Sequence, residues 1–229
     1  SRALLLRPTR SAVRKELERH AATAKAWESV VTTYRAAASL AEGETRAGFL
    51  RRAAEILEGQ LGRHDEALAA WKQLGELLPD DAEIQKRIEA LLARTGSHRE
   101  LIAGYERELA QTNELDARRA LLEKISSSVE QDGGDAAARL EIYRRQLELD
   151  PDSAATLERL ASACLALERW DELARTYERL TALAADAATA RGWRLRRAQV
   201  LASRLDRKEE AGQCFLELLE EEPTRTELV

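Results

Sequence analysis

Large aromatic side chains recur along this chain at nearly constant spacing, and this spacing limits the possible folds more than any other feature. Successive members are 37, 34, 38, 34 and 38 residues apart. These six ladder aromatics are Tyr34, Trp71, Tyr105, Tyr143, Tyr177 and Phe215. Repeats of about 20–50 residues are typical of stacked units, none of which can bury its own apolar face. We therefore expect one elongated array rather than a globular fold with a catalytic pocket.

The composition favours helices throughout the chain. The 229 residues are 44% hydrophobic and 34% charged, with only 4 prolines. Leu, Ala, Arg and Glu dominate, and all four are strong helix formers. Apolar residues recur at helical spacing, as at Leu157, Leu160, Ala161 and Cys164. The breaks between such runs suit only short turns between antiparallel helices. The prediction is an all-α fold of about six helical hairpins over residues 11–40, 44–78, 82–110, 115–149, 154–184 and 187–221.

The hairpins resemble the tetratricopeptide repeat. In the second hairpin, Gly62 lies at the turn, the small Ala67 follows, Trp71 is the large aromatic and Pro79 follows the hairpin. Other hairpins keep parts of this pattern: Gly134, Tyr143 and Pro151 in the fourth, and Ala211, Phe215 and Pro223 in the last, where Asp206 replaces the glycine. The resemblance implies a right-handed α-solenoid over residues 1–229 as a single domain. We also expect an internal fragment of a longer array, because Leu5, Leu6 and Pro8 match the end of a hairpin at Leu77, Leu78 and Pro79.

The resemblance also implies a binding surface. In this family the first helix of each hairpin lines a concave groove that holds peptides. Carried over to this sequence, the groove wall consists mainly of basic residues: Lys15, Arg19, Lys86, Arg87, Arg94, Arg119, Arg159, Ser162, Arg191 and Arg194, with Arg51, Arg52, Arg118 and Arg196 added by the longer hairpins. Arginine suits carboxylates, so we expect a protein or peptide partner of acidic character. The alternative is ion pairing within helices, for example Glu55 with Arg51 or Arg52.

No residue pattern predicts catalysis. His20, His64 and His98 have no acid or cysteine at a catalytic spacing, and the two cysteines form no CxxC motif. We expect no enzymatic activity, no metal and no cofactor.

The composition also disfavours two other classes of partner. The net charge of −5 lacks the basic excess of a nucleic-acid binder. No run approaches the ~18 apolar residues of a membrane span, so no membrane insertion is expected.

These observations favour a non-enzymatic scaffold that binds a peptide, helix or folded partner on its concave face. One alternative is a structural or self-assembling spacer of a larger multidomain bacterial protein. Another is a regulatory part of an enzyme whose catalytic domain lies elsewhere. We expect a cytoplasmic location. End-to-end self-association is expected because neither end resembles a polar capping helix. If the groove is used, exchanging Arg87 and Arg159 for Glu should abolish binding without loss of helicity.

Overall fold

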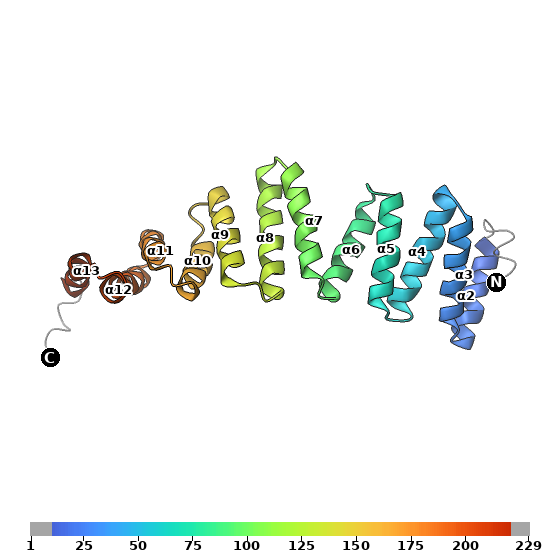
Figure 1. The fold of residues 1–229 in the computed structure, drawn as a ribbon, viewed down its shortest axis with the longest axis horizontal. Helices are drawn as coiled ribbons and strands as arrows, with labels where there is room; N and C mark the ends of the chain where they lie inside the picture. The colour runs from blue at the N-terminus through green and yellow to red at the C-terminus, as the bar shows by residue number, and fades with distance from the viewer. Residues whose placement is uncertain (1–10, 221–229) are drawn as a thin grey trace. The chain divides into compact units, whose positions relative to one another are not determined.

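The computed structural model describes residues 11–220, and all secondary-structure elements in that range are α-helices. They form six pairs joined by short turns (Figure 1). The pairs are α2 (Ser11–Ala24) and α3 (Trp27–Leu40), α4 (Gly43–Gly59) and α5 (His64–Leu77), α6 (Ala82–Arg94) and α7 (His98–Gln111), α8 (Leu115–Gln131) and α9 (Ala136–Leu149), α10 (Ala154–Ala166) and α11 (Trp170–Ala182), and α12 (Ala187–Ser203) and α13 (Lys208–Glu220). The predicted all-α fold of helical hairpins is confirmed.

Contacts between Cα atoms divide the chain into two compact units, Ser1–Leu101 and Ile102–Val229. In the first unit, α2 to α6 contact one another in chain order, and in the second unit α8 to α13 do the same. Each of these helices packs mainly against its neighbours in the sequence, as in a stack of repeats. A single domain over residues 1–229 stays a prediction. No helix within residues 11–220 is long and apolar enough to cross a membrane.

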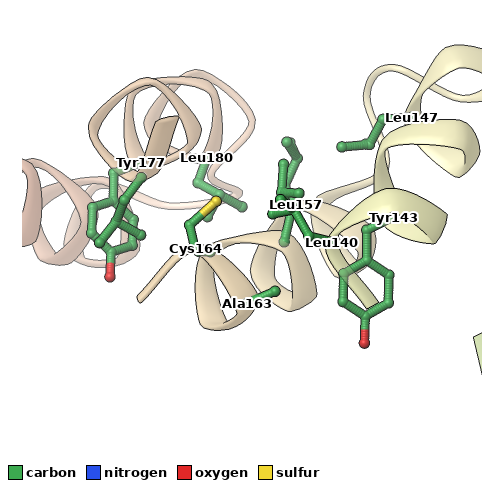
Figure 2. Packing of buried hydrophobic residues seen from close by; sticks show 11 residues of the cluster. Leu140, Tyr143, Leu147, Leu157, Ala163, Cys164, Tyr177 and Leu180 are labelled. Atoms are coloured by element: carbon green, nitrogen blue, oxygen red, sulfur yellow. The ribbon is translucent and has the colours of Figure 1, made fainter. Parts of the chain in front are cut away.

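The ladder aromatics supply the core of the stack, as the sequence predicts. Five of the six are buried, including Tyr105 and Tyr177, and Phe215 is half-buried. Tyr143 and Tyr177 belong to one apolar cluster that also contains Leu157 and Cys164 and draws on α9, α10 and α11 (Figure 2). Burying one such side chain contributes about 1.5–3 kcal/mol. Neighbouring hairpins therefore provide the cover that a single hairpin lacks.

The turn inside each hairpin uses a backbone conformation that favours glycine. In five hairpins the residue nine before the ladder aromatic has a positive φ. These residues are Lys25, Gly62, Gly96, Glu168 and Asp206, with φ of 52°, 63°, 71°, 54° and 53°. Glycine adopts this left-handed conformation freely, whereas a residue with a Cβ is strained there by about 1–2 kcal/mol. Three of the turns are therefore strained.

The fourth hairpin departs from the glycine position that the resemblance implies. There the left-handed residue is Gly133, with φ of 67°, and not Gly134. Gly134 serves another purpose, because a Cβ at that position would lie 2.7 Å from the carbonyl oxygen of Val129. This turn thus needs two glycines, one for its backbone conformation and one for a close approach.

The strained turns lead to a stability prediction. Glu168→Gly is expected to stabilise the chain by about 0.5–1 kcal/mol, because glycine relieves the left-handed strain and the exposed Glu168 side chain makes no hydrogen bond or ion pair within the described residues. The reverse change, Gly62→Ala, should cost about 1 kcal/mol through backbone strain alone, since no atom lies within 4 Å of the added Cβ. Urea unfolding at pH 7 measures both. A lower midpoint for Glu168→Gly would contradict this interpretation.

Candidate interaction surface

The predicted groove residues all lie on the first helices of the hairpins. We call α2, α4 and α6 the first-helix row of the first unit, and α8, α10 and α12 that of the second. Seven of the ten predicted residues are exposed: Lys15, Arg19, Lys86, Arg87, Arg94, Arg119 and Ser162. The other three, Arg159, Arg191 and Arg194, are half-buried. Most of the predicted residues are therefore accessible to a ligand.

Several of these arginines bind a carboxylate of the preceding first helix. Arg87 of α6 lies 3.3 Å from Glu58 of α4, and Arg159 of α10 lies 3.3 Å from Glu123 of α8. Each of these guanidinium groups therefore joins two hairpins and is not simply directed at solvent.

Arg52 shows both kinds of pairing at once. It binds Glu18 of the preceding first helix through two nitrogens, and it also meets Glu55 of its own helix at 2.5 Å. The hydrogen bonds to Glu18 raise the pKa of Arg52 above its usual range. The ion pair within one helix that the sequence suggests, Arg52–Glu55, is thus present. Arg52 also forms an ion pair with Glu18 of another helix.

The same carboxylates also hold the polar tips of the ladder aromatics. The Tyr34 hydroxyl donates to Glu18 at 2.6 Å, and the Trp71 indole nitrogen donates to Glu58 at 3.3 Å. A third example lies in the second unit, where the Tyr143 hydroxyl donates to Glu130 at 2.8 Å. Burial, followed by the bond to Glu130, raises the pKa of Tyr143 to about 12.

Each of these carboxylates therefore joins the aromatic of its own hairpin to an arginine of the next. We call these sets carboxylate bridges: Glu18–Tyr34–Arg52, Glu58–Trp71–Arg87 and Glu130–Tyr143–Arg159, the last with 3.9 Å between Arg159 and Glu130. These bridges were not predicted from the sequence. The sequence contains a signal for them, since Glu58 and Glu130 both lie thirteen residues before their aromatic and are 72 residues apart, the sum of one 34-residue and one 38-residue ladder step.

A second set of ion pairs joins the second helices of neighbouring hairpins. The basic residue directly after a ladder aromatic binds a glutamate at the start of the next second helix. The pairs are Arg35–Glu66 at 3.1 Å, Lys72–Glu100 at 2.5 Å and Arg144–Glu172 at 2.7 Å. The last pair is bidentate, with a second bond of 2.9 Å. Ion pairs therefore link the hairpins along both sets of helices.

The Arg144–Glu172 pair predicts a response to acid. Hydrogen bonds from Arg144 hold the pKa of Glu172 below its ordinary value. A lowered carboxylate pKa contributes stability that is complete above about pH 4.3, the unfolded value, and is lost as the pH falls through the folded pKa. Glu172→Gln should cost about 1 kcal/mol at pH 7, and the gap from the unmodified chain should close towards pH 3. Urea unfolding across this range measures it; a gap independent of pH would contradict the assignment.

The remaining predicted residues have varied surroundings. Arg19 lies 2.6 Å from Glu16 on its own helix, and Arg119 donates to the carbonyl oxygen of Leu149 at 2.9 Å. Within residues 11–220, Lys86 and Arg94 of α6 form no ion pair or hydrogen bond, although both are exposed. These two cations are therefore available to a ligand.

Three basic residues that the longer hairpins add to the predicted wall also have partners. Arg51 binds Asp81, the N-cap of α6, at 2.8 Å, and Arg118 donates to the carbonyl oxygen of Thr112 at 3.1 Å. Arg196 instead lies over the ring of Trp193, 4.5 Å from its centroid.

The described residues contain no group suited to metal binding: no three His, Cys, Asp or Glu side chains lie together within residues 11–220. His64 and His98 are the first residues of α5 and α7, and His20 contacts Glu16 at 3.0 Å. Cys164 and Cys214 are both buried and free. Burial raises the pKa of the Cys164 thiol to about 12, which disfavours the reactive thiolate.

The repeated helical hairpins and the buried aromatic ladder define a tetratricopeptide-like fold, as the sequence resemblance predicts. No protein-family model and no curated protein matches the sequence. Similar solved structures include YrrB, "a TPR protein with an unusual peptide-binding site", at 13% identity and a TM-score of 0.42 over 78% of this chain and 87% of that chain.

Two further similar structures have comparable scores. The TPR-like repeats of a putative kinesin light chain from Podosopora anserina show 16% identity and a TM-score of 0.42 over 82% of this chain and 100% of that chain. MamA shows 14% identity and a TM-score of 0.41 over 80% of this chain and 94% of that chain. At such low identity these similarities concern the fold and not the partners.

Proposed function

We propose that this chain is a non-enzymatic scaffold that binds a peptide, a helix or a folded protein on the face formed by its first helices, which is concave in tetratricopeptide repeats. The observation that carries the proposal is the pair of exposed cations on α6. Most first-helix arginines are held by carboxylates or carbonyl oxygens, whereas Lys86 and Arg94 have no such partner within the described residues. Unpaired cations favour an acidic protein ligand. The net charge of −5 disfavours nucleic acid.

The variants Arg87→Glu and Arg159→Glu are poor tests of this proposal. Both arginines belong to carboxylate bridges, so a reversed charge would also repel Glu58 or Glu123 and disturb the contact between hairpins. A loss of binding could then follow from a loss of structure. Lys86 and Arg94 avoid this ambiguity.

The test is a peptide-display selection against the chain, followed by affinity measurement on variants. The double variant Lys86→Glu with Arg94→Glu should weaken the selected ligands at least tenfold with unchanged helicity. The matched control is Arg107→Glu with Arg175→Glu, which reverses two exposed arginines on second helices. The proposal fails if no peptide is enriched, or if the control weakens binding as much as the double variant.

A self-assembling spacer is the alternative function, and one observation favours it. On α13, Leu216 is 62% exposed and Leu219 is 50% exposed. If this face mediates self-association, sedimentation velocity should show oligomers that grow with concentration, and Leu216→Glu with Leu219→Glu should return the chain to a monomer. A strictly monomeric unmodified chain would exclude this function. For either function we propose a cytoplasmic setting, which suits two free cysteines.

A further inference from the structure

Among the described residues no carboxylate bridge of this kind joins α10 to α12. Thirteen residues before Tyr177, where Glu58 and Glu130 precede their own aromatics, the chain has Cys164. Within the described residues the Tyr177 hydroxyl therefore makes no hydrogen bond. The Tyr177 ring stacks on Trp193 instead, with 5.6 Å between centroids, and its hydroxyl oxygen points out of the apolar cluster (Figure 2).

A cavity of about 210 Å³ lies at this interruption. One face of α12 and its C-cap residue line the cavity, at positions i, i+3, i+4, i+7 and i+8: Arg196, Gln199, Val200, Ser203 and the C-cap Arg204. Leu165 of α10 and three residues of α11 form the rest of the apolar wall: Trp170, Leu173 and Tyr177. Leu165 is 53% exposed, so an apolar surface faces solvent beside the two arginines.

The two arginines of the cavity have no carboxylate partner among residues 11–220. Arg196 lies over the ring of Trp193, 4.5 Å from its centroid, and Arg204 lies over Trp170 at 4.8 Å. Neither forms an ion pair within the described residues. A guanidinium stacked on a ring keeps its N–H edge free for a carboxylate. Helix α12 supplies no internal partner either, since its seventeen residues contain four arginines and no Asp or Glu.

The spacing of the arginines selects the geometry of a ligand. Arg196 lies on α12 and Arg204 is the C-cap residue of this helix, eight residues later, which corresponds to about 12 Å along the helix axis. In an extended peptide, side chains at i, i+2 and i+4 point to the same side, and i to i+4 spans about 13 Å. Two acidic residues four apart would therefore reach both arginines, with the residue midway between them directed at the cavity.

We propose that this cavity binds an extended peptide segment with the pattern acidic–any–apolar–any–acidic. The carboxylates bind Arg196 and Arg204, the apolar side chain packs against Leu165 and Trp170, and the Tyr177 hydroxyl donates to an oxygen of the peptide. This inference rests on the proposed function and names one subsite for it, separate from Lys86 and Arg94. All residues that line the cavity belong to the second unit, so this unit alone contains the whole cavity.

The four tryptophan indole N–H signals in a two-dimensional NMR spectrum provide the test. Trp170 lines the cavity, whereas Trp27 and Trp71 belong to the first unit and serve as internal controls. The probe is the peptide acetyl-Glu-Ala-Leu-Ala-Glu-amide. Its controls replace Leu with Ala, or both Glu with Gln. The probe should shift the Trp170 signal saturably, and each control peptide should bind at least fivefold more weakly.

The variants decide whether the arginines are responsible. Arg196→Glu with Arg204→Glu should weaken the probe at least tenfold, whereas Arg107→Glu with Arg175→Glu, which changes the net charge equally, should not. The inference is overturned if Trp170 does not shift, if a scrambled peptide binds equally well, or if Trp170 shifts with protein concentration alone, which would identify a second copy as the occupant. Display-selected ligands that depend on Lys86 and Arg94 would in that case leave the proposed function intact.

Discussion

Replacing Trp71 with Ala is expected to lower the free energy of unfolding by about 3–5 kcal/mol, the largest effect of any single change proposed for this chain. Trp71 is 2% exposed and is the largest fully buried side chain. Its removal leaves a cavity that the neighbouring helices cannot fill, and it deprives Glu58 of the indole donor. Urea unfolding monitored by circular dichroism measures the loss.

The location of the damage is also predictable. Helices pack against their sequence neighbours, so hydrogen exchange in Trp71→Ala should accelerate most in α4, α5 and α6. Leu40→Ala is the control: Leu40 is 77% exposed, and its removal should change stability by less than about 0.5 kcal/mol. Similar losses for Leu40→Ala and Trp71→Ala would contradict the role of the aromatic ladder.

Replacing Glu18 with Gln should cost about 2–3 kcal/mol, the second-largest effect. The Glu18 side chain is 17% exposed and binds both the hydroxyl of Tyr34, which is itself buried, and the guanidinium of Arg52. An amide keeps the shape of the side chain but removes its charge and one acceptor oxygen. The Tyr34 hydroxyl and the Arg52 guanidinium then share a single, weaker hydrogen-bond acceptor. Thermal and urea unfolding at pH 7 measure the effect.

The matched control is Glu55→Gln. Glu55 binds the same Arg52, but it lies three residues away on the same helix and its side chain is 41% exposed. Exposed pairs of this kind contribute about 0.3–0.5 kcal/mol. A double-mutant cycle with Arg52→Gln should give a coupling energy that is clearly larger for Glu18 than for Glu55. Equal coupling would mean that the carboxylate bridge adds nothing to ordinary helix pairing.

The hairpins and the aromatic ladder were predictable because their causes are local or periodic. Helical spacing of apolar residues depends on a few neighbouring positions, and a ring such as Tyr105 recurs at a period that only stacked units explain. The left-handed turn residues were partly predictable. Gly62 and Gly96 are glycines, which favour this conformation, but Lys25 and Glu168 adopt it although their residue types do not indicate it.

The charged surface was less predictable. A sequence of arginines and glutamates offers many possible partners, and pairing within one helix is the nearest of them. Arg87 instead binds Glu58, twenty-nine residues earlier, because stacking places α6 beside α4. Most of the arginines that the sequence suggests for ligand binding are therefore held by the protein itself.

Within the described residues, the sequence alone determined the six hairpins and the burial of five of the six ladder aromatics, since helix periodicity and the ladder steps of 34 to 38 residues can be read along the chain. Only the tertiary structure decided which charges remain for a partner. A carboxylate neutralises an arginine only when the helices that carry them meet. In the fifth hairpin Cys164 has the position that Glu58 and Glu130 have in theirs, and within the described residues Arg196 and Arg204 contact aromatic rings and form no ion pair.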